Sequence, residues 1–135
     1  MGIGTFLPIK TAHVENHKMA NEYYQISQST ANLVNQALQE QRRVIAVGTT
    51  SCRTLETMGK SGTLAAGAGW SDIFIYPGFV FHIVCGLLTN FHLPKSTPLL
   101  LVSAFASQDM ILAAYQEAIL QKYRFYSYGD SLLIL

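Results

Sequence analysis

The segment Thr89–Thr97 gathers side chains that are able to do chemistry. Its nine residues include an amide, an imidazole, an ammonium group and three hydroxyls. His92 is suited to accept a proton near neutral pH, Asn90 to orient a ligand hydroxyl or a base edge, and Lys95 to meet a phosphate or carboxylate. Pro94 fixes its own φ and restricts the residue before it, so part of the loop is expected to be stiff. The cluster predicts a catalytic or binding loop; the alternative is that its polar groups satisfy the backbone of a buried crossover.

A second candidate lies at Gly48-Thr49-Thr50-Ser51, between a predicted strand and a predicted helix. Unpaired N–H groups and the hydroxyls of Thr49 and Thr50 suit an anion or a carboxylate at such a position. The segment lacks the lysine of a P-loop and the three glycines of a dinucleotide fingerprint. Ordinary helix capping therefore remains the competing explanation.

Two further segments carry weaker patterns of residues that could do chemistry. The segment 123–130 interleaves tyrosines and a phenylalanine with Arg124 and Asp130, which suits stacking on a base and pairing a charge, although an amphipathic strand explains it equally well. His13 and His17 have the spacing of two metal ligands on one helical face, but a third ligand is missing. We therefore expect no metal site.

The elements that would position these groups follow from hydrophobic periodicity. Residues 43–47 show no polar alternation, which predicts a strand buried on both faces and covered by helices on both sides. Ser27 is placed to cap a helix over 28–41, and residues 22–26 before it favour a short strand over an early helical turn. The remaining expected elements are a helix over 53–58 ended by Gly59, a surface loop over 60–69, strands over 72–76 and 79–84 that meet at Pro77-Gly78, a strand over 99–105, a helix from Ser107 to about Tyr123, and a final apolar run over 132–135. This alternation predicts the α/β class, as a three-layer α/β/α sandwich.

Length and composition limit the function classes. A chain of 135 residues, 50% apolar and 13% charged, suits one globular domain. The longest nearly apolar stretch, residues 98–106, is too short to cross a bilayer, and the amino terminus does not have the pattern of a signal peptide, so a cytoplasmic location is expected. Cys52 and Cys85 are then expected to be free thiols. A net charge of +1 argues against a free-standing nucleic-acid binder, so any RNA contact is local or made by other residues.

Six ordered motifs, spread from end to end of the chain, resemble the S-adenosylmethionine:tRNA ribosyltransferase-isomerase family. They are Gly4-Thr5-Phe6-x-Pro8, His17-Lys18-Met19 with Glu22, Val47-Gly48-Thr49-Thr50 with Arg53-Thr54-Leu55-Glu56, Asp72-Ile73-Phe74-Ile75-Tyr76-Pro77-Gly78, the loop Thr89–Thr97, and Tyr123-Arg124-Phe125-Tyr126-Ser127-Tyr128-Gly129-Asp130. The resemblance identifies the chain as a single partial α/β domain, residues 1–135, from the carboxy-terminal portion of the family's main domain.

The resemblance implies a reaction in queuosine biosynthesis. The ribosyl part of S-adenosylmethionine is transferred to 7-aminomethyl-7-deazaguanine at the tRNA wobble position and isomerised, which gives epoxyqueuosine-tRNA, adenine and methionine. S-adenosylmethionine is then a consumed substrate, and no metal or other cofactor is implied.

This chemistry assigns hypothetical roles to the candidate residues. His92 is the acid/base, and Asp130 balances the sulfonium charge. The expected substrate-binding residues are Thr49, Thr50, Arg53, Asn90, Lys95, Arg124 and Tyr128.

The chain also departs from the family pattern. The family's earlier part of the main domain and its inserted small β-barrel domain are absent, and Met1 falls inside the family's Val-Gly-x-Gly-Thr-Phe strand, so an edge strand is expected to be lost or frayed. Ala20 stands where the family usually has histidine, and Cys85 where it usually has aspartate. Two alternatives therefore stay open: an enzyme whose missing half comes from another chain, or a truncated non-catalytic copy that retains the fold and binds a ligand or partner. An unrelated α/β nucleotide-binding enzyme is a third reading.

Overall fold

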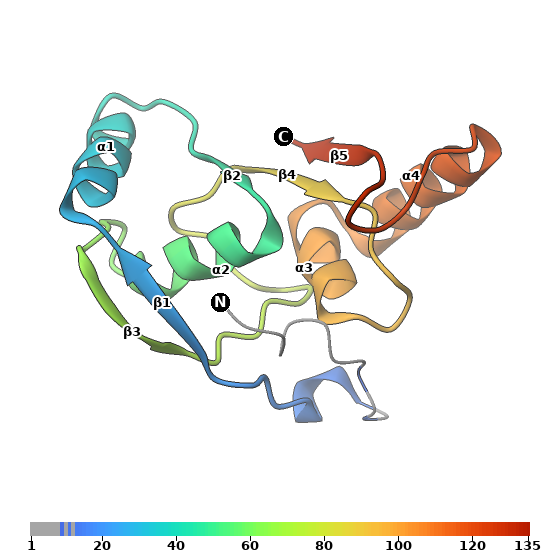
Figure 1. Ribbon diagram of the computed structural model, residues 1–135, viewed down its shortest axis with the longest axis horizontal. Helices are drawn as coiled ribbons and strands as arrows, with labels where there is room; N and C mark the ends of the chain where they lie inside the picture. Colours follow the sequence, from blue (N-terminus) through green and yellow to red (C-terminus); the bar gives the residue numbers. More distant parts are fainter. Residues whose placement is uncertain (1–8, 10, 12) are drawn as a thin grey trace.

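A three-stranded sheet forms the centre of the molecule, whose computed structural model describes residues 9, 11 and 13–135 (Figure 1). Strand β2 (Ile45–Val47) runs parallel to β4 (Gly86–Asn90), and β5 (Ser131–Ile134) pairs with the other side of β4 in the antiparallel sense. Because β2 and β4 are parallel, their carboxyl ends meet at one edge of the sheet. The strand at 22–26 and the α/β class are confirmed, and most of the final apolar run belongs to β5. The amino-terminal edge strand that was expected to be lost or frayed, and the motif at residues 4–8, lie outside the described residues.

A separate two-stranded ribbon carries the first long helix. Strands β1 (Glu22–Ile26) and β3 (Gly67–Ser71) pair antiparallel, and α1 (Gln28–Gln39) follows β1. The Ser27 hydroxyl accepts the N–H of Thr30 at 3.1 Å, which confirms the predicted cap. Ala31 packs with Ile26 and Leu64 in a small core between the helix and the ribbon. The predicted surface loop over 60–69 is thus wrong in its last three residues, which pair as part of β3.

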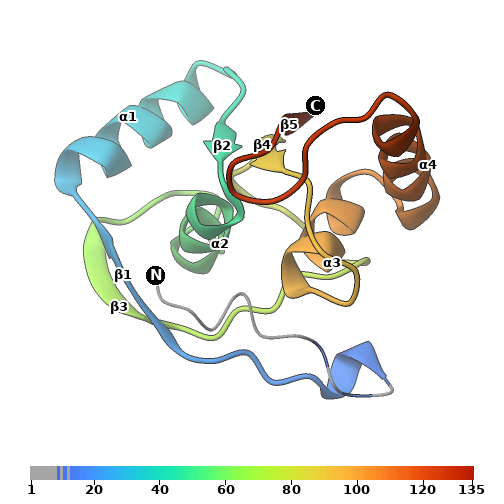
Figure 2. The same ribbon diagram turned by 45° about the vertical axis from the view of Figure 1, so that its right-hand side comes forward.

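Helix α2 (Thr49–Met58) lies between this ribbon and the central sheet, as both views show (Figures 1 and 2). It starts four residues earlier than predicted and ends at Gly59, as predicted. Toward the ribbon, Arg53 Nη1 pairs with Glu22 Oε2 at 2.7 Å, and both side chains are buried. Toward the sheet, Cys52 is fully buried in the main core. The helix therefore fixes the ribbon to the sheet.

The strands predicted over 72–76 and 79–84 are wrong, because side chains of α2 take the backbone partners that a strand would need. The buried Glu56 carboxylate accepts the N–H groups of His82, Ile83 and Val84 at 2.9, 3.0 and 2.8 Å. Arg53 Nε donates to the carbonyl of Ile73 at 3.1 Å. The segment is apolar because it fills the core, yet its backbone bonds to side chains and forms no ladder.

The prediction of a strand over 99–105 is also wrong, because this segment forms helix α3 (Thr97–Phe105). The Ser96 hydroxyl accepts the N–H of Leu99 at 3.3 Å, and Pro98 occupies the first turn, as helix starts prefer. The helix has apolar residues on all its sides, so its hydrophobic residues show no 3.6-residue period in the sequence. Helix α4 (Gln108–Leu120) starts after Ser107, as predicted, and packs on α3.

One face of the central sheet is open, which contradicts the predicted burial of 43–47 on both faces. Ala46 is 3% exposed, whereas its neighbours Ile45 and Val47 are 42% and 67% exposed.

A short 3₁₀ helix, Val14–Asn16, completes the described elements. Within the described residues, no single helix has the length and apolar character to cross a membrane; only α3 and α4 taken together would, and that pair is bent by 112°.

Candidate functional site

A cavity of about 390 Å³ lies at the carboxyl ends of the parallel strands β2 and β4. This is the edge at which open α/β sheets bind ligands, and the volume is that of a small-molecule pocket. The cavity is lined by Gly48, Thr49, Thr50, Thr89, Asn90, Phe91, His92, Leu93, Ser96, Pro98, Tyr126 and Ser127. Three loops that are far apart in the sequence therefore build one site.

The first wall is the turn from β2 into α2. Gly48 has a φ of 86°, a conformation that favours glycine, and its N–H donates to the carbonyl of Leu88 at 2.8 Å, which extends the parallel ladder. Among the described residues, no side chain caps the start of α2. Its first N–H groups and the positive end of the helix dipole thus lie beside the Thr49 and Thr50 hydroxyls. This wall suits a carboxylate or another electron-rich oxygen.

The second wall carries His92, which follows the end of β4. Its Nε2 lies 3.0 Å from Thr89 Oγ1, and its backbone N–H donates to the Tyr115 hydroxyl at 2.8 Å. Burial lowers the pKa of His92 to about 4, because the imidazolium form would lose its hydration. Burial raises the pKa of Tyr115, so its phenol stays protonated. At neutral pH, His92 is a neutral imidazole whose ring contacts the Thr89 hydroxyl, while the Tyr115 hydroxyl holds the backbone of the same residue.

Asn90 ends β4 and faces the third wall. Its Nδ2 lies 3.5 Å from the carbonyl of Gly129 and 3.4 Å from that of Asp130. These are long contacts, so the amide is weakly held between the sheet and the loop before β5. A ligand hydroxyl or base edge in the cavity would compete for this amide.

The third wall is the loop 123–130, whose two ends are joined by hydrogen bonds between Asp130 and Arg124. The Asp130 carboxylate accepts the backbone N–H of Arg124 at 2.7 Å and the Arg124 guanidinium at 3.2 Å. The backbone N–H of Arg124 is the main reason that the pKa of Asp130 lies below its ordinary value. Tyr126 has a φ of 70°, and its N–H donates to the carbonyl of Phe91 at 3.2 Å. The loop thereby places Tyr126 and Ser127 on the cavity.

The cavity brings together four of the nine predicted site residues: Thr49, Thr50, Asn90 and His92. The other five do not line it. Arg53 is buried in its pair with Glu22, Arg124 and Asp130 pair with each other in the loop, Lys95 is exposed, and Tyr128 is 98% exposed.

Sequence reasoning missed several residues that the structure places at or behind the cavity. Tyr126, Ser127, Ser96 and Thr89 lie in segments that the sequence had singled out, so only the choice of side chain was unresolved. Tyr115 lies in α4, 23 residues from His92, and no sequence signal connects the two.

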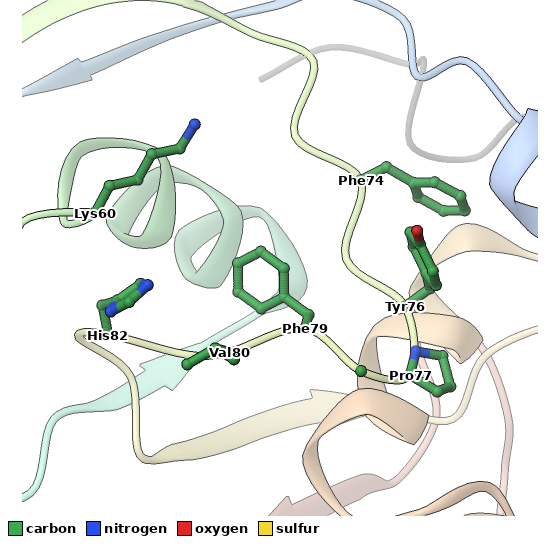
Figure 3. Close-up of a pocket in the computed structure, with 8 residues that line it drawn as sticks. Lys60, Phe74, Tyr76, Pro77, Phe79, Val80 and His82 are labelled. Carbon is green, nitrogen blue, oxygen red and sulfur yellow. The ribbon is translucent and has the colours of Figure 1, made fainter.

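A second hollow of about 600 Å³ lies on the irregular segment between β3 and β4 (Figure 3). Aromatic and apolar side chains line it, with Lys60 and His82 at one end, and none of the predicted site residues reaches it.

His17 packs against Phe74 with ring centroids 5.1 Å apart. Within the described residues, no three metal-ligating side chains gather, and His13 and His17 have no third partner of that kind.

Three comparisons place this chain among known proteins. A family model described as "Queuosine biosynthesis protein" matches residues 1–134. S-adenosylmethionine:tRNA ribosyltransferase-isomerase of Heliobacterium modesticaldum is 55% identical over 137 residues, which is 100% of this chain and 40% of the relative. The enzyme of the same name from Natranaerobius thermophilus is 56% identical over 99% of this chain and 39% of the relative.

A solved structure agrees with these matches. The crystal structure of S-adenosylmethionine tRNA ribosyltransferase from Thermotoga maritima superposes with a TM-score of 0.80 and 46% identity. The match covers 84% of this chain and 40% of that chain. The present chain thus spans about 40% of the length of the relatives it resembles.

Proposed function

Because this chain belongs to the family described as queuosine biosynthesis protein, we propose that its cavity takes part in transferring the ribosyl group of S-adenosylmethionine to a tRNA base. The acceptor is 7-aminomethyl-7-deazaguanine at the wobble position, and isomerisation of the ribosyl group gives epoxyqueuosine-tRNA, adenine and methionine. S-adenosylmethionine is consumed, and no further cofactor is needed. The chain supplies the carboxy-terminal portion of the family's main domain, and the other portion completes the enzyme.

The observation that carries the proposal is the meeting of Thr49 and Thr50 with Asn90 and His92 at the carboxyl ends of β2 and β4. The amino end of α2 and the two threonine hydroxyls suit the methionine carboxylate or ribose hydroxyls of the donor. Asn90 suits a ribose hydroxyl or a base edge. The neutral imidazole of His92 suits the removal of the proton beside the sulfonium.

The two departures from the family pattern lie outside the cavity lining. Cys85 precedes β4, whereas the cavity begins at Thr89 near the other end of that strand. Five strand residues separate the two ends by roughly 15 Å. Ala20 is exposed before β1. Their replacement therefore leaves the four convergent residues in place.

Adenine release tests the proposal, because ribosyl transfer must break the bond to adenine. The chain is co-expressed with the part of the Heliobacterium modesticaldum relative that lies outside the match, and is given S-adenosylmethionine and tRNA carrying the 7-aminomethyl base. We expect adenine release, and we expect His92→Gln to slow it by about a hundredfold or more, the usual size of an acid–base contribution.

His13→Gln is the matched control, since this exposed imidazole lies outside the cavity. Equal loss in both variants would remove His92 from the chemistry. A folded complex that binds S-adenosylmethionine without releasing adenine would support the alternative, a non-catalytic copy that binds ligand or partner.

A further inference from the structure

The open face of the central sheet carries two apolar rows. In the first row Ile45 pairs with Gly86, and Leu135, directly after β5, lies on the other side of this glycine. The pairing register gives the second row as Val47–Leu88–Leu133. The four side chains on either side of the middle strand, those of Ile45, Val47, Leu133 and Leu135, are 42%, 67%, 52% and 66% exposed. An apolar cluster of this kind on one face of a sheet marks an interaction surface.

In the first row, the side chains of Ile45 and Leu135 lie against the central glycine, Gly86. A Cβ added to Gly86 would lie 3.2 Å from side-chain atoms of both Ile45 and Leu135. These two side chains therefore lean toward each other across the middle strand. The row is a continuous apolar surface, although its central residue has no side chain.

The other face of the same strands is already used. Ala46, Leu87 and Ile134 are 3%, 0% and 9% exposed and belong to the main core, next to α2 and α3. Sheets with parallel strands normally have both faces covered, usually by helices. This sheet has one covered face and one open apolar face.

The length of the relatives indicates what covers it. The two relatives match 100% and 99% of this chain, yet more than half of their own length lies outside the match. We propose that the open face of β2, β4 and β5 docks an amphipathic helix from that other portion of the family's chain. The proposal rests on the proposed function for the identity of the partner, and on the exposed rows for the surface.

The docked helix would also reach the candidate site. The next row along the sheet is polar and consists of Asn90 and Ser131, which are paired in the register. Asn90 lines the cavity, and its side-chain amide makes long contacts to the carbonyls of Gly129 and Asp130. A helix on the apolar rows therefore borders the cavity on its Asn90 side, where it can add groups to the site.

The test compares one substitution in two contexts. Val47→Lys is made in this chain alone and in a chimera in which the chain replaces the matched residues of the intact Heliobacterium modesticaldum relative. In the chain alone the lysine stays in water, and the midpoint of thermal unfolding should shift by less than about 2 °C. In the chimera the charge is buried without a partner, and the midpoint should fall by about 5 °C or more.

Leu120→Lys is the matched control, since Leu120 is 74% exposed at the end of α4 and lies outside the two rows. It should have a small effect in both contexts. If Val47→Lys prevents the chimera from folding, the milder Val47→Thr keeps the comparison measurable. Equal shifts for Val47→Lys in both contexts would overturn the proposal.

A second outcome would also overturn it. If the chain alone sediments as a dimer that Val47→Lys dissociates, the occupant of the face is a second copy. Both readouts are stability and mass, so they stand apart from adenine release, and a failure of catalysis leaves this test unaffected.

Discussion

Replacing His92 by glutamine is expected to flatten the pH dependence of stability between pH 7.5 and 4.5. The half-buried imidazole lies 3.0 Å from the Thr89 hydroxyl, and burial lowers its pKa from 6.5 to about 4. Glutamine keeps a polar atom that can reach the Thr89 hydroxyl but does not titrate. The difference between the two proteins therefore reports on the imidazole.

The sign and size of the effect follow from proton linkage. The unfolded chain takes up a proton at His92 as the pH falls below about 6.5, whereas the folded chain does so only near pH 4. Stability linked to His92 is thus complete above pH 6.5 and is lost as the pH falls through this window. Between pH 7.5 and 4.5 the loss is about 2 to 3 kcal/mol, and it is absent from the glutamine variant.

Urea unfolding followed by circular dichroism measures this difference. Both proteins are unfolded at pH 7.5, 6.5, 5.5 and 4.5, and the variant's free energy of unfolding is subtracted from that of the original chain at each pH. Carboxylates titrate in both proteins and cancel. A difference that stays constant within about 0.5 kcal/mol across the four values would show that His92 is hydrated, and the buried neutral imidazole would have to be given up.

Three further predictions probe the supports of the site. Glu56→Ala removes the shared acceptor of three backbone N–H groups and should lower the free energy of unfolding by about 3 kcal/mol or more in urea. Gly129→Ala places a Cβ against the Arg124 carbonyl, so the loop 123–130 should shift and S-adenosylmethionine affinity should fall in calorimetry. Thr50→Val removes an exposed cavity hydroxyl, so affinity should fall about fivefold to tenfold while the urea midpoint stays unchanged.

Local signals in the sequence predicted the elements that local chemistry decides. Ser27 and Ser107 start α1 and α4 because each hydroxyl accepts an N–H of the first turn, and that contact needs only neighbouring residues. Gly59 ends α2 in the same local way. Residues 22–26 contain residue types that favour strands, and they form strand β1.

The errors have one physical source, which is contact with residues far away in the chain. Residues 72–84 have strand composition, but Glu56 and Arg53 take their backbone partners from α2. Helix α3 is packed inside the molecule and is apolar on all its sides, so its sequence shows no division into an apolar and a polar face. Neither fact can be read from a window of neighbouring residues.

The candidate site shows the same division. The sequence identified the two loops that follow β2 and β4, and the parallel pairing of those strands brought Thr49, Thr50, Asn90 and His92 together. The charged residues were misleading, because Arg53 and Asp130 each have a structural partner that only the fold reveals. The cavity lining is therefore mostly neutral.

This neutrality has a consequence for the proposed chemistry. A sulfonium donor brings its own positive charge, and the described cavity lining contains no carboxylate to balance it. The methionine carboxylate of the donor can lie at the amino end of α2, so the sulfonium must meet its counter-charge on another side. The open side next to Asn90 and Ser131 is where a helix docked on the sheet would lie. The balancing carboxylate is then expected from the partner portion, which makes catalysis depend on that docking.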